Sequence, residues 1–270
     1  MKKHLSYLFA ACLIGLLSCN NIGEDERYIA VETTTPPSSE TKMMRRVLIE
    51  DFTGQRCINC PNAADEIVRL QQAYGADSII AVGIHGGELA FAGTEKLLGL
   101  RTDLGDEYNK HWNLEAWPMG LVNRIGPLAN IDQWFTLVNQ ARKMEAPLNL
   151  AVTTNYDEAS RQLTIITQAD AFATVGGKLQ LWLTESGIVA MQSMPDGNNN
   201  REYVHNHVLR AAVNGAWGED FSAIQGQQVS LQHQFTIDPS WQPSNMAVVA
   251  FVYNDEGVMQ VVEQEVGKVE

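Results

Sequence analysis

Short apolar runs flank an amphipathic segment near residue 60. Residues 47–52 and 78–84 have the length and composition of buried strands. The segment between them has helical periodicity and ends at Gly75. The residues expected on its buried face are Ala64, Ile67, Val68 and Tyr74. Two strands around a helix predict a βαβ unit, which makes this half of the chain α/β.

After Pro147 the pattern changes to alternating apolar and polar positions. Before it, helices are predicted over 94–100, 105–112 and 131–144, with a strand over 120–123. After it, strands are predicted over 149–156, 162–171, 178–184, 229–237, 246–253 and 258–266. Alternating strands separated by turn residues are typical of a β-sandwich. We therefore place a domain boundary at Pro147 and predict two domains, 46–146 and 147–270.

The first 18 residues have the anatomy of a signal peptide. Lys2 and Lys3 precede an apolar stretch over 5–17, which is too short to span a bilayer comfortably. The stretch closes on Leu-Leu-Ser-Cys and resembles a lipobox, which implies that Cys19 carries lipid and begins the mature chain. An ordinary secretory signal with an incidental cysteine is the alternative. Residues 19–45 are polar, acidic and proline-containing, as expected of a flexible tether.

The net charge and the cysteines indicate which partners and which cysteine chemistry the protein can have. Loss of residues 1–18 removes two lysines and no acid, so the formal charge falls from −13 to −15, which argues against a nucleic-acid partner. Cys12 leaves with the signal peptide and Cys19 takes lipid. Cys57 and Cys60 are then one possible disulfide pair, outside the reducing cytosol. No cofactor is indicated.

Cys57 and Cys60 lie between a predicted strand and a predicted helix, where Cys-x-x-Cys is typical of a redox motif. The helix N-terminus favours the Cys57 thiolate, and Arg56 adds to this effect. Cys60 lies one turn on and can attack a mixed disulfide at Cys57, while Pro61 suits the first helical turn. A structural staple is one alternative, although closing so short a loop gains only about 2 kcal/mol. A metal site is another, but it needs two further ligands.

At these residues the chain resembles thioredoxin-like proteins. Asp51-Phe52, followed by four residues and then Cys57, matches the thioredoxin pattern and implies that Asp51 is a buried acid that relays a proton. A solvated acid at a strand end is the alternative. Arg56 and Ile58-Asn59 depart from the usual tryptophan and Gly-Pro, which leaves redox potential and partner choice open.

The resemblance also implies a cis-proline beside the disulfide, for which Pro118 is the candidate. Without the resemblance, Pro118 would be interpreted as an ordinary trans turn proline. The spacing from Cys57 to Pro118 is longer than in thioredoxin. We attribute the excess to an inserted helical segment over 85–115.

Over its whole length the chain resembles the 28-kDa outer-membrane lipoprotein family of the Bacteroidetes. The motifs are the lipobox, Glu-Asp-Phe-Thr-Gly-x-x-Cys-x-x-Cys-Pro at 50–61, Trp-Pro-x-Gly-x-Val-Asn-Arg at 117–124 and Tyr-Val-His-Asn-His-Val-Leu-Arg at 203–210. The resemblance implies an outer-membrane location, a thioredoxin-like domain followed by a β-sandwich, and adhesin or receptor behaviour.

Other polar clusters have weaker signals. His205 and His207 would share one strand face and bind a metal, or form a hydrogen-bonded pair at the sandwich edge. Residues 196–200, Asp-Gly-Asn-Asn-Asn, resemble a calcium loop but lack its full spacing, which favours a solvated turn. His85 and His111 flank the insertion and are either close to the redox motif or ordinary surface histidines.

The predicted fold is therefore α+β with two domains, a thioredoxin-like α/β domain and an all-β immunoglobulin-like sandwich. The predicted function is an outer-membrane-anchored thiol-disulfide oxidoreductase that acts on the thiols or disulfides of envelope proteins and faces either the periplasm or the surface. Cys57, Cys60, Asp51 and Pro118 form its predicted site, and Cys19 holds it to the membrane. The alternative is a binding protein or adhesin whose sandwich takes a surface ligand and whose Cys57–Cys60 disulfide is structural.

Overall fold

The computed structural model describes residues 43–267. The predicted signal peptide, Cys19 and nearly all of the predicted tether lie outside the described residues. Within residues 43–267, no helix is long and apolar enough to cross a membrane.

The βαβ unit predicted near residue 60 is present. β1 (Val47–Thr53) and β2 (Ile79–His85) are parallel, and α1 (Cys60–Tyr74) connects them. The helix buries Ala63, Ile67 and Leu70 against the sheet, whereas Val68 is 49% exposed. The predicted buried face was therefore partly wrong. Positions 63, 67, 70 and 74 are as periodic as the predicted set, and apolar spacing alone does not choose between two neighbouring faces.

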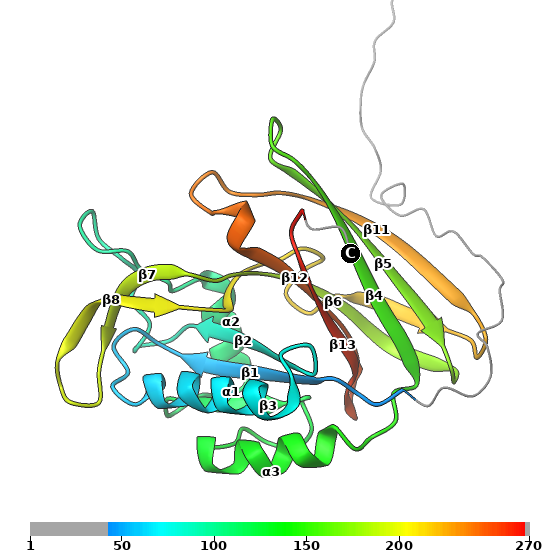
Figure 1. Ribbon diagram of the computed structural model, residues 1–270, viewed down its shortest axis with the longest axis horizontal. Coiled ribbons are helices and arrows are strands. Elements are labelled where there is room, and N and C mark those ends of the chain that lie inside the picture. Colours follow the sequence, from blue (N-terminus) through cyan, green and yellow to red (C-terminus); the bar gives the residue numbers. More distant parts are fainter. Residues whose placement is uncertain (1–42, 268–270) are drawn as a thin grey trace, which may run out of the picture.

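Two more helices and one strand complete the first half. β3 (Met119–Val122) is antiparallel to β1, and α3 (Ile131–Ala141) packs beside α1, while α2 (Asp103–His111) lies on the opposite side of the sheet (Figure 1). The helix predicted over 94–100 was wrong. There the Thr94 hydroxyl accepts the backbone N–H groups of Lys96 and Leu97, a local turn that competes with a helix.

The second half consists of strands. Six of them were predicted or overlap the prediction: β4 (Leu148–Asp157), β5 (Gln162–Ala171), β6 (Val175–Glu185), β11 (Gln228–Thr236), β12 (Met246–Asn254) and β13 (Gly257–Glu265). Four were missed: β7 (Ile188–Ser193), β8 (Asn199–His205), β9 (Val208–Ala212) and β10 (Glu219–Ala223). They are short, and β8 is exposed at most positions, so they have little apolar alternation.

Two sheets pack face to face in the second half, as the alternation predicted. Three strands, in the order β11-β5-β4, cover one face of an eight-stranded sheet (Figure 1). The apolar core between them includes Leu150, Ile165, Leu181, Val248 and Ala250. The fold as a whole is mixed α/β and consists mostly of β-sheet.

The eight-stranded sheet crosses the predicted boundary at Pro147. Its order is β13-β12-β6-β9-β2-β1-β3, with β10 also paired to β6. β9 joins β2 where Gly83 pairs with Val208, so strands from both halves form one sheet. Alternate residues of β12 face the two cores: Val248 packs into the sandwich, and Phe251 packs against α2 and the first half.

Candidate functional site

Cys57 and Cys60 form a disulfide with their Cα atoms 5.4 Å apart. β1 ends at Thr53, and the chain turns before α1 begins at Cys60, with Pro61 in the first turn. The motif therefore has the strand-turn-helix context that was predicted for it. Arg56 is exposed, and its guanidinium lies 5.0 Å from the centre of the Phe91 ring.

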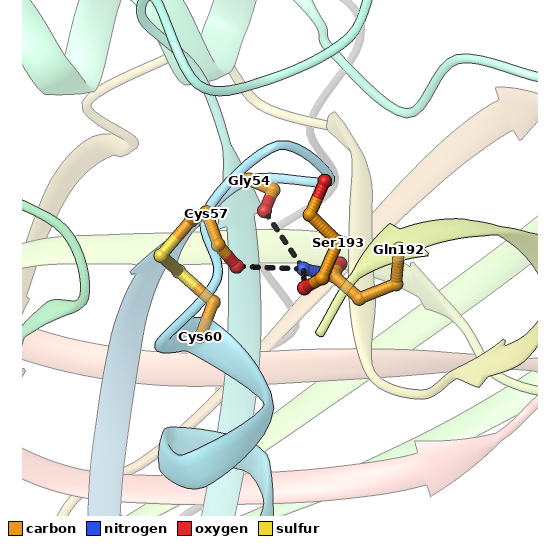
Figure 2. Close-up of a disulfide and its surroundings, with 5 residues drawn as sticks. All are labelled: Gly54, Cys57, Cys60, Gln192 and Ser193. Atoms are coloured by element: carbon orange, nitrogen blue, oxygen red, sulfur yellow. Dashed lines mark hydrogen bonds between the residues drawn. A yellow bond between two sulfur atoms is a disulfide. The ribbon is translucent and has the colours of Figure 1, made fainter. Parts of the chain in front are cut away.

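A hairpin from the second half of the chain packs against the cysteine loop. Cys57 is 2% exposed and Cys60 is 3% exposed. The amide of Gln192, on β7, donates to the carbonyl oxygens of Cys57 (2.9 Å) and Gly54 (3.3 Å), as Figure 2 shows. The β7–β8 hairpin is therefore a structural part of the site. Nothing in the sequence around Gln192 signals this role.

Gln55, within the same loop, connects it to two other segments of the chain. Its buried side chain donates to the carbonyls of Leu98 and Met191, and its Oε1 accepts from the backbone N–H of Leu100. The insertion and β7 are thus both fastened to the cysteine loop. Gly54 is required for this packing, because a Cβ there would lie 2.5 Å from the Leu89 carbonyl.

Asp51 lies beneath the disulfide loop on β1 and is 5% exposed. Its Oδ1 has no hydrogen-bond partner among the described residues, and burial raises the pKa of Asp51 to about 8. The interpretation of Asp51 as a solvated acid was therefore wrong. A carboxyl that keeps its proton at neutral pH can donate it to a departing thiolate.

The Trp117–Pro118 peptide bond is cis, as expected. β3 begins at the next residue, Met119, which pairs with Phe52 near the end of β1. Pro118 therefore lies at the end of β1 from which the cysteine loop departs.

A cavity of about 370 Å³ opens beside Cys60, between α1, the ends of β1 and β2, and β8. Asp51 and Cys60 both contribute to its wall, whereas Cys57 does not. The second half contributes Gln192 and the segment 203–207. The cavity is therefore built jointly by the two halves of the chain.

Two buried histidines face this cavity, one from each half. The ring centres of His85 and His205 are 5.5 Å apart. Burial, and then the charges of His205 and Arg210, lower the pKa of His85 to about 3. Burial lowers the pKa of His205 to about 4, although hydrogen bonds to the hairpin backbone act in the opposite direction. Both rings are therefore neutral at physiological pH.

The other predicted polar clusters do not form the arrangements expected of them, although His207 also lines this cavity. His207 does not form a pair with His205, because its φ of 54° takes it out of the strand, and its ring lies 3.8 Å from the Glu263 carboxylate. His111 packs on Trp217, away from the cavity. Asp196 accepts the backbone and side-chain N–H groups of Asn198 within the β7–β8 turn. Among residues 43–267, no cluster of three or more His, Cys, Asp or Glu side chains could hold a metal ion.

The family model for outer membrane protein Omp28 matches residues 105–270, which is more than half of the chain. The chain belongs to the Omp28 family. It is therefore an outer-membrane protein, and the family resemblance predicted from the motifs is confirmed. The matched residues include the β7–β8 hairpin and the sandwich, whereas Cys57 and Cys60 precede them.

Two solved structures from Porphyromonas gingivalis are similar to this Omp28-family chain. HBP35 is 15% identical with a TM-score of 0.64, over 86% of this chain and 78% of HBP35, which shows a shared fold. A domain of the outer membrane lipoprotein Omp28 is 24% identical with a TM-score of 0.32, over 45% of this chain and 88% of that domain. The comparison with curated proteins gave no significant match.

Proposed function

We propose that this protein is a lipid-anchored thiol-disulfide oxidoreductase that acts on the thiols or disulfides of envelope proteins. The observation that carries the proposal is the Cys57–Cys60 disulfide at the start of α1, beside the buried Asp51, whose Oδ1 has no hydrogen-bond partner among residues 43–267. The order β1, α1, β2 and β3, with Pro118 before β3, is the order that a thioredoxin-like domain would have, and it supports the proposal. Cys19 would provide the anchor.

The chemistry begins from the oxidised state. A substrate thiolate attacks the Cys57 sulfur, the bond to Cys60 breaks, and the Cys60 thiolate takes the proton of Asp51. A second substrate thiolate then attacks the substrate sulfur of the mixed disulfide and displaces Cys57 as a thiolate, which the start of α1 stabilises. Asp51 and Cys57 then take protons from solvent. The substrate leaves as a disulfide and the cysteine pair is reduced, and the reverse sequence reduces a substrate disulfide.

The burial of the disulfide sets a condition on this function. Because Cys57 is 2% exposed, a protein substrate can reach its sulfur only when neighbouring residues move, and we propose that the β7–β8 hairpin, whose Gln192 holds the cysteine loop, makes this movement. The hairpin pairs with no other strand of residues 43–267, so it can move without breaking the eight-stranded sheet.

The contacts of the cysteine loop favour a second candidate function, a binding protein with a permanent disulfide. Gln192 and Gln55 fasten the cysteine loop to two other segments, as expected for a structural bond. In that case the β-sandwich would carry the ligand or adhesin surface.

Trapping separates the two functions. In full-length, membrane-anchored protein, Cys60→Ala leaves Cys57 free to attack substrate disulfides but removes the thiol that resolves the product. We expect defined envelope proteins to accumulate in mixed disulfides with this variant, visible on non-reducing gels and identified by mass spectrometry.

The matched controls are Cys57→Ala and the double variant, with folding verified by circular dichroism. The double variant should trap nothing, and Cys57→Ala should trap far less than Cys60→Ala. A folded Cys60→Ala variant that traps no more protein than the double variant would favour the binding function instead.

A further inference from the structure

Three side chains around the cavity beside Cys60 have polar atoms without a hydrogen-bond partner among residues 43–267. They are Asp51 Oδ1, His85 Nδ1 and His205 Nε2, and each residue is at least 94% buried. All three line the same cavity. Buried polar groups in proteins are nearly always hydrogen-bonded, so three together in one cavity indicate a ligand.

The redox chemistry explains at most one of them. Asp51 can serve as the proton relay, but no step at the cysteines requires His85 or His205. The two imidazoles belong to different halves of the chain, on β2 and β8, and lie 5.5 Å apart between ring centres. The cavity therefore has a polar wall that the exchange reaction does not use.

These polar groups are uncharged at neutral pH. Burial raises the pKa of Asp51 to about 8 and lowers the pKa of His85 to about 3 and of His205 to about 4. An ion in this cavity would lose its hydration without meeting a counter-charge among these three groups. The polar wall therefore suits an uncharged ligand.

The three polar groups also have definite hydrogen-bonding roles toward a ligand. The His205 ring is hydrogen-bonded to the backbone of Ala190 and Met191 on its other side, which leaves Nε2 as an acceptor. Protonated Asp51 supplies an O–H donor, and His85 Nδ1 accepts or donates according to its tautomer. A carboxamide matches this set, because its oxygen accepts one hydrogen bond and its NH₂ group donates two.

The helix α1 and the strand β2 line the cavity mainly with apolar side chains. These are Pro61, Ala64, Ile67, Val68 and Ala81, and α1 also contributes Gln71 and the exposed carboxylate of Asp65. Two of the cavity's lining residues, Val68 and Val204, are each 49% exposed to solvent. A volume of about 370 Å³ accommodates a small planar group with one polar edge.

We propose that this cavity is a binding site for an uncharged carboxamide whose polar edge meets Asp51, His85 and His205 and whose apolar part lies against α1. The carboxamide belongs either to a glutamine or asparagine side chain of a polypeptide or to a free small amide. This function goes beyond the redox proposal, because binding does not require the disulfide to turn over.

Three planar probes of nearly equal shape test the proposal with the oxidised, full-length protein at pH 7. They are benzamide, which is neutral, benzoate, which is an anion, and benzamidine, which is a cation. Binding is measured by ligand-observed NMR and calorimetry. We expect benzamide to bind at least tenfold more tightly than either ion. Equal binding of all three probes, or no binding of benzamide, would overturn the proposal.

Substitutions in the cavity wall test whether benzamide binds in this cavity. His205→Phe keeps the ring and removes the acceptor, and should weaken benzamide binding about five- to tenfold. Ala64→Trp fills the cavity from α1 and should abolish binding. The matched control is His111→Phe, an exposed histidine outside the cavity, which should change nothing. Unchanged affinity in both cavity variants would contradict the proposal.

A competition arm identifies the source of the amide. A short peptide that contains glutamine should displace benzamide if the natural ligand is a polypeptide, whereas the same peptide with leucine should not. Without displacement by either peptide, a free amide is the ligand. Because all readouts use the oxidised protein, a failed trapping experiment leaves this test unaffected.

Discussion

Asp51→Asn is expected to raise the free energy of unfolding by about 3 kcal/mol at pH 8 and by little at pH 4. The wild-type protein buries a carboxyl whose pKa rises from 3.8 to about 8 on folding, because burial penalises the charge. Asparagine has nearly the same shape and no proton to lose. The variant should therefore be the more stable protein wherever the unfolded Asp51 is ionised.

The sign follows from proton binding. Between pH 4 and 8 the folded wild-type protein keeps the Asp51 proton, whereas the unfolded chain has released it. Stability from this group is complete below the unfolded pKa and is lost as the pH rises to the folded pKa. Each pKa unit is worth about 1.4 kcal/mol, so four units set an upper limit of about 6 kcal/mol. The buried amide of asparagine offsets part of the gain.

Urea unfolding of both proteins from pH 4 to pH 9 measures this difference. The gain should grow steadily to about pH 8 and then level off. The control is Asp65→Asn, an exposed carboxyl on the rim of the same cavity, which should change stability by less than about 0.5 kcal/mol. A difference for Asp51→Asn that does not vary with pH would contradict the buried, protonated state of Asp51.

Glu50→Gln is expected to destabilise the fold by about 3–5 kcal/mol, because it leaves a buried guanidinium without a counter-charge. Glu50 and Arg124 are 1% and 4% exposed, and two hydrogen bonds of 2.6 and 3.1 Å join them. The Arg124 guanidinium also lies 4.4–5.6 Å from the ring centres of Trp182, Phe251 and Tyr253. The pair therefore joins β1 to the core shared by both halves.

The loss should appear as a lower urea midpoint with an unchanged slope. An exposed pair provides the control: Asp220→Asn removes the partner of Lys178 at the surface and should cost less than about 1 kcal/mol. Glu50→Leu combined with Arg124→Met should recover much of the loss, because both charges are then absent. If Glu50→Gln costs no more than Asp220→Asn, the ion pair does not stabilise the core as described.

The Cys-x-x-Cys site was predictable because its signals are local. The strand, the turn, the Cys-x-x-Cys motif and Pro61 follow one another within 15 residues, and Asp51 lies within that strand. The sandwich strands were predictable for a similar reason, since their alternation is visible within each strand.

The remaining features depend on contacts between distant residues. Gln192 reaches the cysteine loop from 135 residues away, and His205 meets His85 across the two halves. Neither residue has a local pattern that predicts such a contact. The shared sheet was missed because β9 is only five residues long. In each case the contact is formed by tertiary packing, which the apolar periodicity of a single segment does not encode.

The reduction potential of the Cys57–Cys60 pair tests the central claim most directly. Full-length protein is equilibrated in dithiothreitol buffers of graded potential, and the reduced fraction is counted by thiol alkylation and mass spectrometry. An exchanging pair should have a midpoint between about −270 and −120 mV, the range of dithiol oxidoreductases. A midpoint below about −300 mV would contradict the oxidoreductase proposal, because a disulfide of that potential resists exchange and is typical of a structural bond.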